Sequence, residues 1–127
     1  MIFENQIDPA SLRDVSLKSL AHLGDAVFEL YEREKEVLTT SNTKNLHNQV
    51  VLRVNALSQA NILEKIQGSL TDKEKDIVRR ARNMKVNSYK KIDQSVYRLA
   101  TAFEALLGYL YLTDLKRLEE ILKLTEE

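Results

Sequence analysis

The sequence has no cysteine and no tryptophan, and it has only three glycines and one proline. Without cysteine there is no disulfide framework, no thiolate zinc site and no cysteine nucleophile, and this fits a reducing compartment. No apolar run approaches the ~20 residues of a membrane-spanning helix, and the N-terminus lacks the basic and apolar regions of a secretory signal. We therefore expect a cytoplasmic protein that does not enter a membrane.

The scarcity of Gly and Pro also bears on the fold. Together with apolar residues at three- and four-residue spacing, it predicts an all-α protein, and 127 residues suit one domain, 1–127. Asp8-Pro9 and the capping-box sequence from Thr71 to Glu74 mark two helix starts. The expected helices span about 9–14, 16–37, 44–58 with a shorter helix to 66, 71–82, a segment capped by Asp93 or Ser95 that ends near 112, and a last one capped by Thr113 or Asp114.

The net charge is zero, but the charge is unevenly distributed. The segment RRARNMKVNSYKK, residues 79–91, has six basic residues and no acidic one, so the rest of the chain sums to −6. Such a patch binds phosphates of nucleic acid, and its single aromatic residue, Tyr89, favours a duplex over stacked single-stranded bases. The arginines have an alternative, purely structural explanation, because cations at the C-terminal end of a helix interact favourably with its dipole. This explanation does not cover the lysines that follow the helix. The candidate phosphate-binding residues are Arg79, Arg80, Arg82, Lys85, Lys90 and Lys91.

The stretch LAHLGDAVFELY, residues 20–31, carries Gly24 and Asp25 inside an expected helix, although both residues disfavour helix interiors. A helical wheel places Asp25 at the border of the buried stripe, beside Phe28. Asp25 therefore has access to both the core and solvent. The predicted stripe consists of Leu17, Leu20, Leu23, Val27, Leu30 and Tyr31.

The segment VYRLATAFEALLGYLYL, residues 96–112, repeats this arrangement. Glu104 is its only acid and has the same angular offset from its stripe, and Gly108 lies one turn further on. Glycine lets another backbone approach closely, so Asp25 and Glu104 would face one another if the two helices pack together. The predicted stripe consists of Val96, Leu99, Phe103, Leu106, Leu107 and Leu110.

A single acid at a helix border is usually solvated or paired with Lys or Arg, but a matched pair favours a functional role. Two facing carboxylates are ligands that Mg²⁺ prefers, with Mn²⁺ as a substitute, and such an ion can promote phosphodiester hydrolysis. The absence of Cys and of a paired-His motif argues against zinc. We expect His22 to lie on the surface and His47 to be structural.

Four segments resemble the ribonuclease III family. SLAHLGDAVFELY resembles its signature helix, RRARNMKV its Arg-Asn motif, and ATAFEALLGYLYL its second catalytic helix, with the two acids 79 positions apart. NLHNQVVLRVNALSQA, residues 45–60, resembles the helix between them. Because the sequence ends at residue 127, we expect no double-stranded-RNA-binding domain, as in the Mini-ribonuclease III subfamily.

The resemblance implies a ribonuclease III-type helical domain acting as a homodimeric, Mg²⁺-dependent endonuclease of double-stranded RNA. Its implied role is maturation of 23S ribosomal RNA, with 5′-phosphate products and with a ribosomal protein as a further partner. The implied catalytic and metal-binding residues are Asp25 and Glu104, and Asn83 would contact a 2′-hydroxyl. Two further acids of the family are replaced by Ala21 and Thr101, which leaves the number of metal ions open.

The sequence leaves two other assignments open. Glu29 and Glu32 follow Asp25 on one flank of the helix and are candidates for groups around the metal ligands. The alternative function is a non-catalytic dimeric RNA-binding or assembly module on the same fold, which the retained acid pair disfavours. A purely structural helical dimer would leave the six uninterrupted cations unexplained.

Overall fold

The computed structural model describes residues 6–39, 48, 50, 51, 53–84 and 94–126. This part of the chain contains helices and no strand, which confirms the all-α prediction. Residues 48, 50, 51, 53 and 54 are helical and precede α3. The elements are two short 3₁₀ helices, η1 (Pro9–Leu12) and η2 (Gln67–Ser69), and the helices α1 (Leu17–Thr39), α3 (Ala56–Ile66), α4 (Asp72–Arg82), α5 (Gln94–Thr113) and α6 (Leu115–Leu124).

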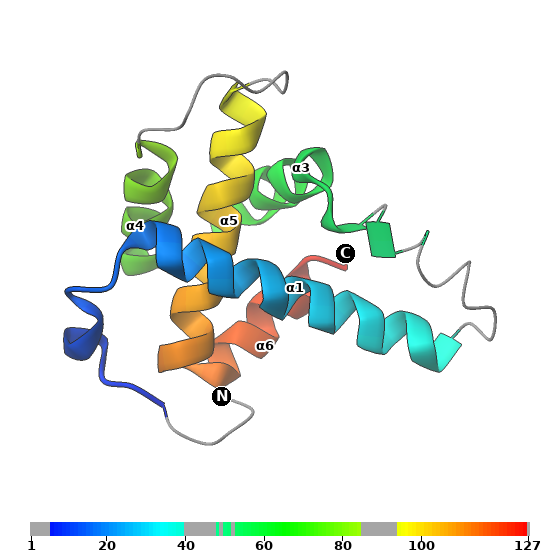
Figure 1. Ribbon diagram of the computed structural model, residues 1–127, viewed down its shortest axis with the longest axis horizontal. Coiled ribbons are helices and arrows are strands. Elements are labelled where there is room, and N and C mark those ends of the chain that lie inside the picture. Colours follow the sequence, from blue (N-terminus) through cyan, green and yellow to red (C-terminus); the bar gives the residue numbers. More distant parts are fainter. Residues whose placement is uncertain (1–5, 40–47, 49, 52, 85–93, 127) are drawn as a thin grey trace.

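Helix α5 lies at the centre of the fold. Helices α1, α3, α4 and α6 all pack against it, and α1 runs across its middle (Figure 1). The composition of α5 explains this position, because small and large apolar residues occur on nearly every face and leave room for neighbours on all sides. Its buried residues are Ala100, Ala102, Phe103, Ala105, Leu106, Leu107, Gly108 and Leu110.

The core is centred on an aromatic pair between α1 and α5. Phe28 and Phe103 have no solvent exposure, and their rings meet edge to face with centroids 5.1 Å apart. Leu63 of α3 and Ile121 of α6 are also fully buried in this core. Burying a side chain of this size contributes roughly 1.5–3 kcal/mol, so these residues fasten three helices to α5.

Three predicted helix starts are confirmed by their caps. The Asp8 carboxylate accepts a hydrogen bond from the Ala10 amide at 3.1 Å, and Asp114 accepts one from the Arg117 amide at 3.1 Å. At α4, the Thr71 amide donates to the Glu74 carboxylate at 2.9 Å and the Glu74 amide donates to the Thr71 hydroxyl at 3.2 Å. Each cap satisfies a helix-end amide that would otherwise lack a partner.

The predicted helix over 44–58 does not continue as expected. A new helix, α3, begins at Ala56, and Asn55 is its N-cap, with the Ser58 amide donating to the Asn55 side chain at 2.9 Å. Asparagine favours a cap over a helix interior because its side chain competes for backbone amides. The helix boundary therefore lies three residues earlier than the sequence interpretation placed it.

The predicted buried face of α1 is partly wrong. Leu20 is buried as expected, but Leu30 is 42% exposed and Leu23 is only half-buried. The face turned to the core is Leu20, Ala21, Gly24, Phe28 and Glu32. A helical wheel gives most weight to large apolar residues, whereas the contact with α5 uses small ones.

A partly buried ion pair between Arg117 and Glu74 fastens α6 to α4. The Arg117 guanidinium donates to the Glu74 carboxylate at 2.8 and 2.9 Å and to the Ser69 carbonyl at 2.8 Å. Burial opposes ionisation of Glu74, but the hydrogen bonds from Arg117 and Thr71 outweigh it and lower the pKa of Glu74. Among the described helices, none has the length and apolar character needed to cross a membrane.

Candidate active site

Helices α1 and α5 touch backbone to backbone at Gly24 and Gly108. A Cβ atom on Gly24 would overlap the Glu104 carbonyl oxygen and would lie 2.6 Å from its carbonyl carbon and 2.9 Å from the Gly108 nitrogen. A Cβ atom on Gly108 would overlap the Leu20 carbonyl oxygen. Only glycine fits either position, and this confirms that Gly24 allows the helix bearing Glu104 to come close.

This contact brings the two predicted acids together. The Asp25 side chain is exposed, the Glu104 side chain is half-buried, and the two share a hydrogen bond. Burial, the hydrogen bond from Glu104 to Asp25 and the charge of Asp25 raise the pKa of Glu104 to about 8, against a smaller lowering by Gln59. Near neutral pH, Glu104 therefore largely keeps its proton.

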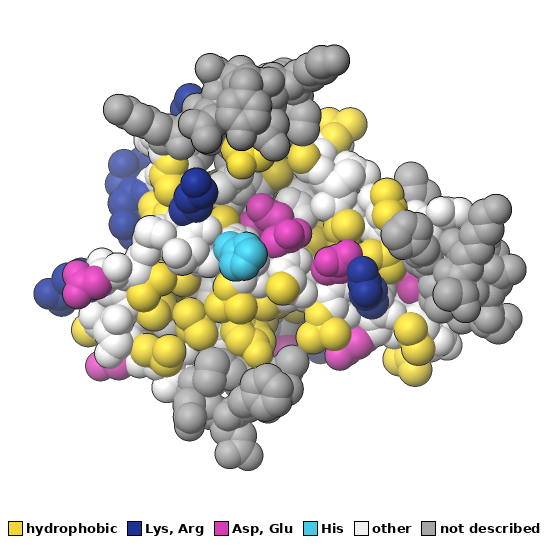
Figure 2. Space-filling model, viewed as in Figure 1, with side chains coloured by type: hydrophobic (Ala, Val, Ile, Leu, Met, Phe, Trp, Pro, Cys, Tyr) yellow, Lys and Arg dark blue, Asp and Glu magenta, His cyan; other side chains and the backbone are white. Residues whose placement is uncertain are grey.

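The acid pair is open to solvent on one side. Figure 2 shows acidic side chains near the middle of the face on which α1 crosses α5. His22, three residues before Asp25, is exposed as predicted. A phosphate group could therefore reach the carboxylates without displacing a helix.

The donors at this position suit a hard divalent cation. They are oxygens alone, and within the described ranges no group of three or more His, Cys, Asp or Glu residues could hold a metal ion. Two carboxylates leave most of an octahedral shell for water and phosphate oxygens, which is how Mg²⁺ is commonly bound. The residues present therefore fit Mg²⁺ held jointly by protein and substrate.

The predicted arginines lie at the C-terminal end of α4. Arg79, Arg80 and Arg82 are exposed in its last turn, and Asn83 is its C-cap. Asp76 forms ion pairs with Arg79 and, at 3.1 Å, with Arg80, so part of this positive charge is neutralised within the helix. Lys85, Lys90 and Lys91 lie outside the described residues, as do His47 and Tyr89.

A surface cavity adds a further cation to this end of α4. It has a volume of about 460 Å³ and lies between α4 and η2. Lys75, Arg79 and Arg82 line it beside the apolar Leu70 and Val78. Three cations around one hollow extend the basic surface that the sequence placed on residues 79–91.

The sequence interpretation missed Gln59. It is 2% exposed in the first turns of α3, and it hydrogen-bonds Glu104. A signal was present, because Gln59 occupies the same helical face as the buried Leu63 and Ile66. A polar side chain on a buried face needs a hydrogen-bond partner, and here that partner is the acid pair.

The chain is similar to known proteins over most of its length. Residues 18–115 match the ribonuclease III domain family. The chain belongs to this family. It is 45% identical over 121 residues to Mini-ribonuclease 3 of Gloeobacter violaceus, covering 95% of this chain and 90% of that protein. It is 49% identical over 109 residues to Mini-ribonuclease 3 of Thermoanaerobacter sp., covering 84% and 77%.

A solved structure shares the fold of this ribonuclease III domain. The crystal structure of protein FN1578 from Fusobacterium nucleatum is 38% identical, with a TM-score of 0.79 and coverage of 91% of this chain and 93% of that one. Together with the Mini-ribonuclease 3 relatives, this supports a ribonuclease III-type endoribonuclease acting on RNA.

Two positions of this ribonuclease III domain depart from the acids that the resemblance implies. Ala21 is 6% exposed in the core between α1 and α5, and Thr101 is half-buried. An ionised carboxylate at position 21 would be costly without a cation beside it. The crossing of α1 and α5 therefore presents Asp25 and Glu104 rather than a larger acidic cluster.

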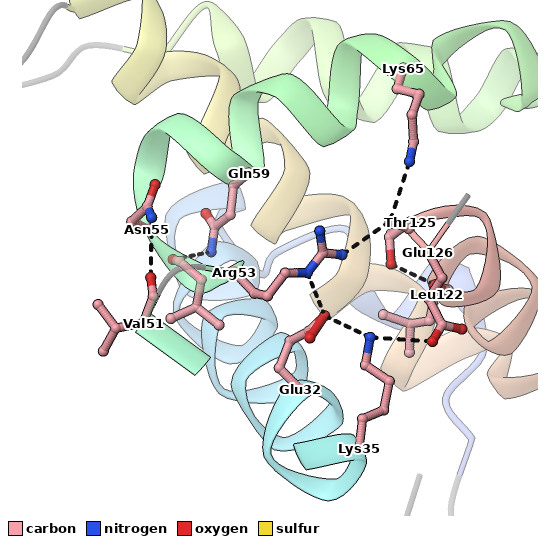
Figure 3. A network of polar contacts seen from close by, with 11 residues as sticks. Glu32, Lys35, Val51, Arg53, Asn55, Gln59, Lys65, Leu122, Thr125 and Glu126 are labelled. Carbon is pink, nitrogen blue, oxygen red and sulfur yellow. Dashed lines mark hydrogen bonds and ion pairs between the residues drawn. The ribbon is translucent and has the colours of Figure 1, made fainter. Parts of the chain in front are cut away.

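The structure gives Glu29 and Glu32 other partners. Glu29 pairs with Arg33 on the surface at 2.9 Å. Glu32 is 1% exposed and accepts from Arg53 at 3.3 Å and from Lys35 at 3.2 Å, within a network that reaches the C-terminal end of the described chain (Figure 3). Their role as groups around the metal ligands is therefore not supported, because cations already neutralise both.

Proposed function

We propose that this chain is a Mg²⁺-dependent endonuclease of double-stranded RNA, in which Asp25 and Glu104 hold the ion. The observation that carries this proposal is the acid pair at the crossing of α1 and α5. Besides burial, the side chains given as acting on the pKa of Glu104 within the described part of the chain are Asp25 and Gln59, and neither is a cation. Two neighbouring carboxylates are unfavourable together, and a divalent cation would reverse that repulsion.

The proposed reaction is hydrolysis of a phosphodiester bond. A water oxygen attacks phosphorus, the bond from phosphorus to the 3′ oxygen breaks, and the leaving oxygen takes a proton. The products carry a 5′-phosphate and a 3′-hydroxyl. Bound Mg²⁺, or Mn²⁺ in its place, would lower the pKa of a water molecule and stabilise negative charge on the phosphate oxygens. Asp25 and Glu104 would hold this cation at the open side of the helix crossing.

The basic residues supply the substrate-binding part of the proposal. Glu104 lies ten residues into α5, roughly 15 Å along the helix from the end that follows the basic segment. We propose that a duplex bound at the acid pair extends towards the basic segment, so that one of its phosphates reaches Asp25 and Glu104 while another contacts Arg82. Asn83 beside it is our candidate for a 2′-hydroxyl contact, because such contacts distinguish RNA from DNA.

Finer assignments belong to the same proposal. We propose 23S ribosomal RNA precursor as the natural substrate, a ribosomal protein as an accessory partner, and action in the cytoplasm. We also propose a homodimer, since a two-fold protein suits a duplex substrate. In support, the described part of α1 exposes large apolar side chains that a second copy could cover, namely Leu30, Val37 and Leu38.

Replacing Asp25 by asparagine tests the catalytic assignment. Asp25→Asn keeps the size of the side chain but removes one metal-binding oxygen and the negative charge. We expect cleavage of long duplex RNA in Mg²⁺ to fall by at least roughly 100-fold, as when an essential electrostatic group is removed. Folding and RNA binding should remain, as measured by circular dichroism and by filter binding without divalent cations.

The matched control is Glu34→Gln, which makes the same chemical change at an exposed position further along α1. It should cleave at the parent rate. Cleavage by Asp25→Asn near the parent rate would remove Asp25 from the site. Binding without cleavage by the parent protein, with or without Mg²⁺, would instead favour the non-catalytic RNA-binding module.

The salt dependence of RNA binding tests the basic segment. Replacing Lys85, Lys90 and Lys91 by glutamine should weaken binding of duplex RNA at low salt. It should also reduce the slope of log affinity against log salt by about 1 for each of these lysines that neutralises a phosphate in the parent complex. Filter binding over a salt series measures both effects.

Lys123→Gln is the control for charge alone, because Lys123 is exposed in the last turn of α6. Its slope should match that of the parent. A triple lysine variant with an unchanged slope would exclude these residues from the RNA interface.

A further inference from the structure

Gln59 is held rigidly at both its backbone and its side chain. Its backbone amide donates to the Asn55 carbonyl at 3.0 Å, and its side-chain nitrogen donates to the Val54 carbonyl at 3.0 Å (Figure 3). The residue is 2% exposed, so water does not compete for these bonds. A buried amide with this anchoring has little freedom to turn.

The same side chain also reaches the acid pair. A glutamine side-chain nitrogen carries two hydrogens. One is used in the hydrogen bond to the Val54 carbonyl, and the second is left to donate to Glu104, whose pKa the Gln59 side chain lowers. This single nitrogen therefore connects the start of α3 with the Glu104 carboxylate in the middle of α5.

We propose that Gln59 is a positioning residue, which orients the Glu104 carboxylate so that oxygen lone pairs stay available beside Asp25 for a divalent cation. This inference rests on the proposed function. An amide suits this task because it is a neutral donor. A lysine at this position would compete with the metal ion for the carboxylate, and a glutamate would add a third negative charge and remove the donor.

The anchor of Gln59 is itself tied to the helix that carries Asp25. Arg53, next to Val54, donates to Glu32 at 3.3 Å and to the Thr125 carbonyl at 3.0 Å (Figure 3). Glu32 lies on α1, two turns beyond Gly24. Contacts with both α1 and α5 therefore fix the position of the Gln59 side-chain amide. These are the two helices that carry the acids.

A purely structural role is the competing explanation. Gln59 also satisfies a carbonyl at the break before α3, so its replacement would loosen that junction whether or not Glu104 is affected. Asn55 offers a matched control, because it caps α3 through the Ser58 amide and donates to the Val51 carbonyl at 3.1 Å. Asn55→Ala loosens the same junction and leaves the Gln59 amide in place.

The test compares Mn²⁺ affinity of the RNA-free protein, measured by water-proton relaxation, in the parent, Gln59→Met, Asn55→Ala and Asp25→Asn. Removing a group that orients a metal ligand typically costs 10–100-fold in metal affinity, and we expect about that loss for Gln59→Met. Gln59→Met and Asn55→Ala should both have a lower melting temperature than the parent, because both loosen the junction before α3. Asn55→Ala should bind Mn²⁺ within about two-fold of the parent, a change well below the loss typical of an orienting group.

The results separate this inference from the proposed function. Equal Mn²⁺ affinity of Gln59→Met and parent, with weak binding by Asp25→Asn, overturns the role of Gln59 and leaves the metal site standing. Equal losses in Gln59→Met and Asn55→Ala also overturn it, because a loosened junction would then suffice. Mn²⁺ binding by Asp25→Asn at parent affinity, or no binding by the parent, contradicts the proposed metal site and this inference with it.

A measurement on the unchanged protein covers the case in which Gln59→Met does not fold. In a Mg²⁺ titration followed by NMR, the side-chain amide signal of Gln59 should shift with the same midpoint as metal binding. The amide of Gln67 in η2 serves as the reference and should not move. A Gln59 signal that is unchanged at saturating Mg²⁺ would overturn the inference.

Discussion

Gly24→Ala is expected to destabilise the protein by more than about 4 kcal/mol, a loss of the size seen only for severe core disruption. The added Cβ would overlap the Glu104 carbonyl oxygen and lie 2.9 Å from the Gly108 nitrogen. Both neighbours are backbone atoms of a central helix, so no side chain can move aside to make room. Helices α1 and α5 would have to separate, and this contact also brings Asp25 to Glu104. Urea unfolding followed by circular dichroism measures the loss.

The protein contains its own control for this prediction. Gly108→Ala should destabilise comparably, since its Cβ would overlap the Leu20 carbonyl oxygen. Gly68→Ala should be neutral or stabilising by up to about 1 kcal/mol, because nothing lies within 4 Å of its added Cβ and alanine restricts the unfolded chain. A melting temperature of Gly24→Ala close to that of Gly68→Ala would mean that the two backbones are not in contact there.

Local signals in the sequence were sufficient to predict three helix starts and to predict that the two acids lie close together. Asp8, Thr71 and Asp114 cap helices because their side chains bond to amides two or three residues away, and such bonds need no distant partner. Asp25 and Glu104 could be paired because each has a glycine within one turn at the border of an apolar stripe. Small residues at matched positions indicate where two helices can approach closely.

The face of α1 that packs against α5 could not be predicted by the same reasoning. The leucines of α1 predict a buried face centred on themselves, but Ala21 and Gly24 face α5 because close backbone packing there favours the smallest residues. Glu32 joins this buried face because Arg53, 21 positions away in the sequence, accompanies it. A pattern of hydrophobicity assigns a buried acid to the surface, since it holds no information about a distant cation.

Glu104 provides the second large prediction, a fall in stability of the metal-free protein as pH rises. Folding raises the pKa of this carboxyl group from 4.5 to about 8, so the folded state binds its proton more tightly than the unfolded state. The resulting stabilisation is complete below about pH 4.5 and is lost as pH rises through about 8. Because one pKa unit corresponds to about 1.4 kcal/mol and Glu104 stays partly in contact with solvent, we expect a change of a few kcal/mol.

Urea unfolding of the parent and of Glu104→Gln, in chelator between about pH 5 and pH 9, isolates this contribution. The glutamine cannot ionise, so the stability of the parent relative to the variant should decrease across the range. Mg²⁺ binds the ionised carboxylates and competes with the proton on Glu104, so it should stabilise the parent more at the alkaline end than at the acidic end. Glu104→Gln should lose most of this Mg²⁺ effect. Parallel stability curves for the two proteins would show that Glu104 titrates alike in the folded and unfolded chains, and this would contradict the raised pKa of Glu104.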